Sequence, residues 1–320
     1  MLVLLALLAS LEPTAAAAGD LAFGAPLVYQ NMTLVPVTTA SPGPFPSYTL
    51  LEEGIAAKTI RVRELAGSDQ GASVNEVEIK NTGREPVFLL SGEMILGGKQ
   101  DRILQSDAII PSNGTWTRVP VFCVEHGRWA GQRMEFSSGG ALAHGRLAEA
   151  ALTGDQSKVW AEVARKNGVE GTENATGTYR RTVQDAKLRE RIARHRSAIK
   201  AMLPRGRLAG FVFAINGEVR VADLFGNPVL LDELADKLIS AYVLEALEEH
   251  TDASAPPMST AAAAQFVSSG QKAATKREVT VGASANTVKE SDEIIANESK
   301  DLGNGGLGTR STYVAKKKKK

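Results

Sequence analysis

LAGFVFAINGEVRVAD, residues 208–223, is the segment that predicts most of the fold. The apolar run Leu208 to Ile215 is typical of a buried strand, and Asn216-Gly217 favours the tight turn of a β-hairpin. Asn227-Pro228 follows directly and predicts the start of a helix that runs to Glu249. A strand pair followed by a long helix therefore forms the centre of the predicted architecture.

Upstream of the hairpin, residues 145–164 and 182–202 have the apolar spacing of helices. The second helix carries one apolar stripe, formed by Leu188, Ile192, His195, Ile199 and Met202. Four arginines lie mostly off this stripe, at positions 189, 191, 194 and 196. They predict a solvated basic face, and the alternative is a surface for an anionic partner.

Residues 20–130 contain short apolar runs that are separated by Pro and Gly. Strands are expected at 27–29, 34–37, 74–80 and 86–94, and a hairpin at Asn113-Gly114 is expected to join 108–110 to 116–124. The predicted fold class is therefore α+β, with a β-rich, sandwich-like N-terminal half packed with a helical half that carries a β-hairpin.

The C-terminal part looks different in composition. Residues 251–258 are expected to be a linker, and residues 259–320 a polar C-terminal extension that begins with a short alanine-rich helix and ends in five lysines. The main domain is expected to span residues 19–250, and an extension of that domain to 315 stays open.

Composition limits the function classes. The chain of 320 residues is 43% apolar and has a net charge of +1, which excludes wholesale disorder and a strongly basic, nucleic-acid-like chain. Cys123 is the only cysteine, so the chain has no internal disulfide. The four histidines are far apart in sequence and show no metal-binding spacing, so no metal and no cofactor are expected.

The N-terminus indicates export. Leu2 to Leu11 is an apolar run that is too short to span a bilayer, and Ala15 to Gly19 supplies the small residues of a cleavage site. The basic residue that usually precedes such a run is missing, so a buried N-terminal helix or a misplaced start is the alternative. We expect residues 1–18 to be a signal peptide, the mature chain to be extracytoplasmic (periplasmic or secreted), and no transmembrane segment to remain in it.

Several long motifs resemble a known family. They are GE at 92–93, GGKQDR at 97–102, VPVFCVEHGRW at 119–129, and GFVFAING at 210–217 leading to DLFG at 223–226. Together they resemble the ADP-ribosylglycohydrolase and rhodanese-phosphatase superfamily-associated protein domain, an uncharacterised bacterial family. The resemblance covers about residues 24–250. The resemblance implies nucleotide or ADP-ribose chemistry in the gene neighbourhood. It does not identify any residue of this chain as catalytic.

The motif around Glu93 contains a carboxylate in an apolar run. A desolvated carboxylate needs a cationic partner or stays protonated, and Lys99 and Arg102 are the expected partners. Gly97 and Gly98, which lie between Glu93 and Lys99, allow backbone amides to approach an anion closely. The motif is therefore either a buried ion pair that fixes a turn or a site for phosphate or carboxylate.

The segment from Cys123 to Trp129 allows a similar choice. On a regular strand Cys123 points away from His126, so a thiol–imidazole pair is disfavoured and a buried core cysteine is expected. Arg128 could stack on Trp129, either as a brace or as the wall of a planar ligand site. The candidate binding residues are Glu93, Gly97, Gly98, Lys99, Asp101, Arg102, Glu125, His126, Arg128 and Trp129.

These observations leave three functional interpretations. The first is an exported binding module for a small anionic ligand or a protein partner, and no nucleic acid is expected. The second is a hydrolase acting on nucleotide-derived or phosphorylated substrates, with Glu93 as general acid or base. The third is a purely structural domain. If the charged motif residues converge on a cavity, a site is favoured, and if they pair with one another, the structural interpretation is favoured.

The N-terminal pattern predicts cleavage near Ala18 on export. The intact mass of protein recovered from the extracytoplasmic fraction of a native-like host should lack residues 1–18. Soluble cytosolic protein whose mass includes Met1 to Ala18 would contradict export.

Overall fold

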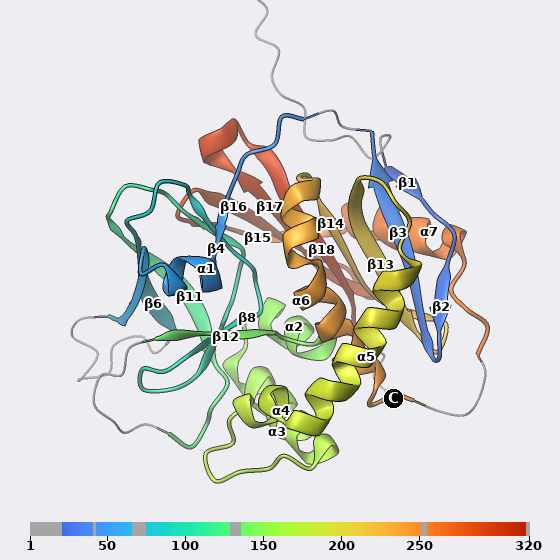
Figure 1. Ribbon diagram of the computed structural model, residues 1–320, viewed down its shortest axis with the longest axis horizontal. Coiled ribbons are helices and arrows are strands. Elements are labelled where there is room, and N and C mark those ends of the chain that lie inside the picture. The colour runs from blue at the N-terminus through green and yellow to red at the C-terminus, as the bar shows by residue number, and fades with distance from the viewer. Residues whose placement is uncertain (1–20, 41–42, 66–74, 129–135, 251–254, 318–320) are drawn as a thin grey trace, which may run out of the picture.

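The predicted hairpin lies at the centre of the largest sheet. The computed structural model describes residues 21–40, 43–65, 75–128, 136–250 and 255–317. Within these ranges nine strands form one sheet in the order β1-β3-β13-β14-β18-β17-β16-β15, and β2 also pairs with β3 (Figure 1). Their bounds are β1 Leu21–Phe23, β2 Leu27–Tyr29, β3 Met32–Thr39, β13 Leu208–Ile215, β14 Glu218–Phe225, β15 Ala274–Val281, β16 Ser284–Glu290, β17 Ile294–Asp301 and β18 Leu307–Ala315.

The turn of this hairpin explains its sequence. Asn216 and Gly217 both have positive φ, 51° and 79°, which is the backbone that a two-residue turn between twisted strands requires. β13 pairs with β14 on one side and with β3 on the other, so the N-terminal strands are held next to the hairpin. The hairpin prediction is confirmed.

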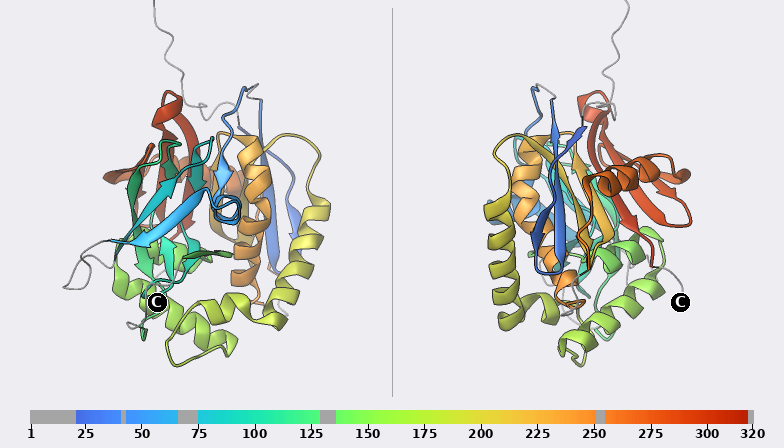
Figure 2. Two further views of the ribbon diagram at one scale, coloured as in Figure 1. Left: turned by 60° about the vertical axis from the view of Figure 1, so that its left-hand side comes forward. Right: turned by 90° about the vertical axis from the view of Figure 1, so that its right-hand side faces the viewer.

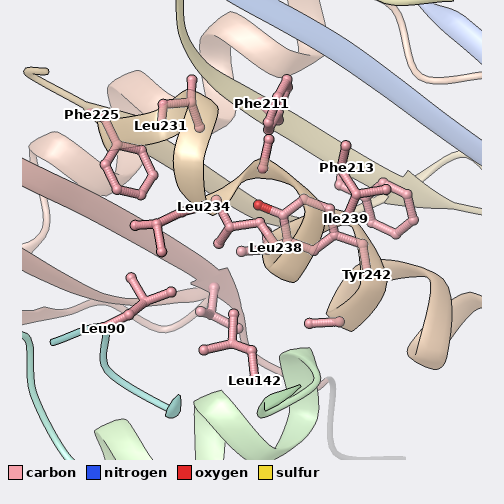
Figure 3. Packing of buried hydrophobic residues seen from close by; sticks show 14 of the residues in the cluster. Leu90, Leu142, Phe211, Phe213, Phe225, Leu231, Leu234, Leu238, Ile239 and Tyr242 are labelled. Carbon is pink, nitrogen blue, oxygen red and sulfur yellow. The ribbon is translucent and has the colours of Figure 1, made fainter. Parts of the chain in front are cut away.

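Helix α6 (Pro228–Ala246) covers one face of the large sheet. Asn227 caps it as predicted, because its Oδ1 accepts hydrogen bonds from the backbone amides of Val229 and Leu230 at 3.0 and 3.4 Å. The rings of Tyr242 and Phe213 stack with centroids 5.0 Å apart. Figure 3 shows the aliphatic side chains of α6 packed between Phe211 and Phe213 of β13 on one side and Leu90 and Leu142 on the other.

The opposite face of the sheet is covered by α7 (Thr260–Gln271), as the right-hand view of Figure 2 shows. The short alanine-rich helix expected at the start of the C-terminal extension is therefore present, whereas the four strands that follow it were not expected. The strands β15–β18 continue the sheet, although few of their residues are apolar. Many of their buried side chains are polar and linked by hydrogen bonds: Nδ2 of Asn297 donates to Asn286 at 3.0 Å, and Asn286 donates to the carbonyl of Asp107 at 2.9 Å.

Two smaller sheets form the β-rich N-terminal half. In the described part of the chain their orders are β10-β7-β4 and β12-β8-β9-β11-β6-β5. The bounds are β4 Thr49–Leu50, β5 Ile60–Glu64, β6 Glu76–Asn81, β7 Val87–Leu89, β8 Glu93–Leu96, β9 Arg102–Leu104, β10 Ala108–Ile110, β11 Trp116–Cys123 and β12 Ser137–Leu142. These sheets, with the helices, confirm the α+β class.

Two local predictions in this half are wrong. The apolar run 86–94 is not one strand, because a turn at Ser91-Gly92, where Gly92 has a φ of +81°, separates β7 from β8. The turn at Asn113-Gly114 does not join a hairpin, since β10 pairs with β7 while β11 pairs with β6 and β9. Residues that favour a turn are present in both places. Which strands pair, however, depends on strands that lie elsewhere in the sequence.

The remaining helices are α1 Leu51–Ala56, α2 Gly145–Leu152, α3 Gln156–Glu170, α4 Arg180–Gln184 and α5 Ala186–Met202. Both upstream helical segments are thus divided in two, and Asp155 and Asp185 cap the second helix of each pair. None of the described helices is both long and apolar enough to cross a membrane.

The apolar stripe of α5 is confirmed in its main features. Leu188, His195 and Ile199 are buried, and Ile192 is half-buried against the core. Arg196 does not lie free in solvent, because it donates to the hydroxyl of Ser240 on α6 at 3.1 Å.

The packing of α7 predicts opposite effects for two glycine substitutions. A Cβ on Gly270 would lie 2.2 Å from the Tyr313 ring, whereas a Cβ on Gly168 in α3 would lie 3.5 Å from its nearest neighbour, Glu173. Gly270→Ala should therefore destabilise the protein by about 1–3 kcal/mol through overpacking. Gly168→Ala should stabilise it by up to about 1 kcal/mol through helix propensity. Urea unfolding of both variants measures the difference, and a stabilising Gly270→Ala would contradict this position of α7.

Candidate functional site

The motif residues form a group of ion pairs, which we call the polar cluster: Glu64, Asp101, Arg102, Glu125, Arg128 and Arg180. Arg102 is fully buried at the start of β9 and donates to both carboxylate oxygens of Glu64, at 3.0 and 2.9 Å. This bidentate geometry, with two parallel hydrogen bonds, is the strongest form of an arginine–carboxylate contact. Arg102 is therefore bound to Glu64. The predicted contact between Arg102 and Glu93 is not formed.

Asp101 and Glu125 are satisfied in the same way. Asp101 accepts from Nε of Arg180 at 2.8 Å and from the hydroxyl of Thr178 at 2.9 Å. Glu125 accepts from Nε of Arg128 at 2.8 Å, and this contact helps to hold the pKa of Glu125 below its ordinary value although burial opposes it. Each of these carboxylates thus has an arginine of the protein as its partner.

The Gly97-Gly98 turn does bind anions through its amides, but the anions belong to the protein. The amide of Gly97 donates to Asp101 at 3.1 Å, and the amide of Lys99 donates to Glu64 at 2.8 Å. Gly98 has a φ of +59°, and a Cβ there would meet both the Phe136 ring and Glu64. The glycines are required by the backbone and by close packing.

The rest of the 123–129 motif is also used in packing. The His126 ring meets the Trp160 ring edge-on, with centroids 4.5 Å apart. Trp129 lies outside the described residues, so the expected stacking with Arg128 stays a prediction. Cys123 is fully buried, and Gln156 bonds its backbone amide and carbonyl at 2.9 and 2.8 Å. Burial raises the pKa of its thiol, as expected for a core cysteine.

Glu93 lies away from the polar cluster, at the start of β8. Its carboxylate forms an ion pair with Lys237 of α6, which also pairs with Glu52 of α1 at 2.8 Å. Glu93 is 2% exposed and Lys237 8% exposed. The predicted coupling to Lys99 or Arg102 is therefore wrong, because the true partner lies 144 residues further along the chain.

Lys237 and Glu52 line a cleft of about 570 Å³ between α5 and α6. Part of its lining is apolar and includes Leu142, Ile192 and Leu244. Its charged lining residues are mixed, namely Glu52, Glu190, Glu233 and Asp236 with Arg189, Arg196 and Lys237. The lining therefore favours neither an anion nor a cation, and the Glu93 side chain is not part of it.

A second cavity, of about 310 Å³, has a lining of one sign, and we call it the cationic pocket. It lies where α5 meets the β2–β3 turn and the end of α6, and its lining residues are Tyr29, Gln30, Arg191, Arg194, His195, Leu247 and His250. These include two arginines and two histidines but no carboxylate. Among the described residues, neither Arg191 nor Arg194 has an ion-pair partner.

His195 is fixed at the wall of the cationic pocket. Its Nδ1 donates to the carbonyl of Arg191 at 2.7 Å, and its Nε2 contacts Oε1 of Gln30 at 3.0 Å. Tyr29 packs edge-on against the same ring, with centroids 5.5 Å apart. His195 was predicted to lie in the core and the arginines in solvent; His195 is indeed buried, and Arg191 and Arg194 are exposed. The spacing of 191, 194 and 195 on one helix face was the available signal, but Gln30 and His250 are distant in sequence.

Metal binding has no support in the part of the chain that the structure describes, where no three His, Cys, Asp or Glu side chains gather closely enough to hold an ion.

The fold and these sites define an α+β protein whose long charged motifs build its interior. The chain belongs to the family described as the ARG and Rhodanese-Phosphatase-superfamily-associated Protein domain, whose family model matches residues 20–305. The resemblance seen in the sequence is thereby confirmed, and the match includes the strands β15–β17. Comparison with curated proteins and with solved structures gives no significant match.

The ion pair at Glu93 predicts a specific pH dependence. Burial outweighs the attraction of Lys237 and raises the pKa of Glu93 from 4.5 to about 7. The stability contributed by protonated Glu93 is therefore complete below pH 4.5 and is lost as the pH rises to about 7. Relative to Glu93→Gln, the wild type should lose about 3 kcal/mol of unfolding free energy between pH 4.5 and 8. Urea unfolding at several pH values measures this.

Glu52→Gln is the matched control on the same lysine. Although burial opposes it, Lys237 holds the pKa of Glu52 below its ordinary value. Its stabilising contribution is therefore present at neutral pH and is lost as the pH falls, which is the opposite trend. Parallel pH profiles for the two variants would contradict the assignment of Glu93 as the raised group.

Proposed function

We propose that this protein is an extracytoplasmic binding module for a small anionic ligand, and that the ligand binds in the cationic pocket. The observation that carries the proposal is the composition of the lining, which has Arg191, Arg194, His195 and His250 and no carboxylate. Cations that lack a protein partner and face a shared cavity attract an anion from solution.

The contrast with the polar cluster supports this choice. There, each arginine is bound by a carboxylate of the protein, so an incoming anion would have to displace Glu64, Asp101 or Glu125. In the cationic pocket, no carboxylate of the described residues pairs with Arg191 or Arg194, so none of them would have to be displaced. The motif residues of the polar cluster are better explained by the structural interpretation, and the ligand site is proposed elsewhere.

His195 forms a fixed part of the pocket wall. Its Nδ1 donates to the carbonyl of Arg191, and its Nε2 contacts Oε1 of Gln30. An imidazole held in this way by Arg191 and Gln30 presents a fixed edge beside the two guanidinium groups.

The hydrolase alternative has weaker support. Glu93, its proposed acid or base, is 2% exposed and bound by Lys237, so it has no direct contact with the cleft beside it. A general acid or base has to come within hydrogen-bond reach of the substrate. Binding without chemistry is therefore the function that the geometry favours.

Titration calorimetry with pyrophosphate tests the proposal. Arg194→Gln removes one unpaired cation from the pocket and should weaken binding at least about tenfold, since a hydrogen bond to a charged group contributes about 1.5–3 kcal/mol. Arg189→Gln is the control, because Arg189 is an exposed arginine of the same helix that lines the other cavity. Binding should weaken as salt is raised. Equal losses in both variants, or no binding by the wild type, would contradict the proposal.

A further inference from the structure

The cationic pocket contains more than charge, and its other features specify the class of anion. Building on the proposed function, we infer that the ligand is an organic phosphomonoester. Its phosphate is held by Arg191 and Arg194, and its apolar group contacts Tyr29 and Leu247.

The charge of the lining favours a dianion. Arg191 and Arg194 are three residues apart on α5, so their side chains leave the helix on the same side, and His195 lies on that side as well. Each guanidinium offers parallel donors that match the oxygens of a phosphate. A phosphomonoester has a second pKa near about 6 and is close to dianionic at neutral pH, whereas a carboxylate or a sulfate ester has a single charge.

The size of the pocket favours an organic ligand over a bare ion. Its volume of about 310 Å³ is far above the ~10–15 Å³ that a single water needs. An inorganic phosphate has five heavy atoms and would leave most of that volume to solvent. A ligand that extends beyond its phosphate therefore fits the space better.

The apolar part of the lining gives the extension a place to bind. Tyr29 and Leu247 both border the cavity and both pack on the main hydrophobic core, so their positions are fixed before a ligand arrives. The Tyr29 ring is also held edge-on against His195. An apolar or aromatic group in contact with these side chains gains affinity by leaving water.

Calorimetry on the full chain with four probes tests this inference. The probes are phenyl phosphate, inorganic phosphate, phenyl sulfate and benzyl alcohol. We expect phenyl phosphate to bind at least about tenfold more tightly than inorganic phosphate and than phenyl sulfate, and benzyl alcohol not to bind measurably. Tyr29→Ala should reduce the affinity for phenyl phosphate several-fold and leave that for inorganic phosphate nearly unchanged, with folding of the variant checked by circular dichroism.

The outcomes separate this inference from the proposed function. If inorganic phosphate binds as tightly as phenyl phosphate, the organic ligand is wrong while anion binding stands. If phenyl sulfate binds as tightly as phenyl phosphate, the preference for a dianion is wrong. If none of the anions binds, or if Arg194→Gln binds them as the wild type does, the proposed function itself fails. Because the probe series uses the wild-type protein, the inference is tested even if Tyr29→Ala does not fold.

Discussion

One buried guanidinium, that of Arg310 in β18, connects the large sheet with the turn between β7 and β8 and with the segment before β10. It donates to Asp223 of β14, with Nε at 3.0 Å, to Asp107 just before β10 at 3.0 Å, and to the hydroxyl of Ser91 between β7 and β8 at 2.8 Å. The Tyr242 hydroxyl of α6 donates to the same Asp223. Two buried carboxylates therefore depend on one arginine, and the loss of such a partner is far more costly than the pair itself is stabilising. The C-terminal strands are for this reason part of the domain's interior.

Features that depend on neighbouring residues could be predicted from the sequence, and features that depend on distant partners could not. The turn at Asn216-Gly217 and the cap at Asn227 follow from local backbone chemistry, and both are present. The strands after residue 273 were missed because many of their buried side chains are polar, such as Asn286, Asn297 and Ser299, which obscures the apolar pattern. Asn286 is 1% exposed, yet its amide is satisfied by Asp107, 179 residues away. The partner of Glu93 was missed for the same reason, because sequence reasoning could offer only nearby cations.

The candidate site shows that a charged motif and a ligand site are distinguished by where the counter-charges come from. In the GGKQDR motif the sequence showed cations and glycines compatible with anion binding, which is correct chemistry. The anions turned out to be Glu64, Asp101 and Glu125, and each accepts hydrogen bonds from arginines or backbone amides of the chain. Composition of a motif alone cannot separate these cases, because Glu64 lies 38 residues from Arg102 and the pairing appears only after folding.

Helix α5 carries an arginine with protein partners on one side and, on another, two arginines that have no ion-pair partner among the described residues. Arg196 faces α6, where it donates a hydrogen bond to Ser240 and forms an ion pair with Asp236. Arg191 and Arg194 face the cationic pocket beside His195. Like charges one turn apart destabilise a helix by about 0.2–0.5 kcal/mol per pair, and the chain could have relieved this with a single carboxylate on the β2–β3 turn. It places Gln30 there instead, and this neutral side chain fixes the imidazole without adding negative charge. Under the proposed function, an anion bound in the cationic pocket would relieve this repulsion and stabilise helix α5.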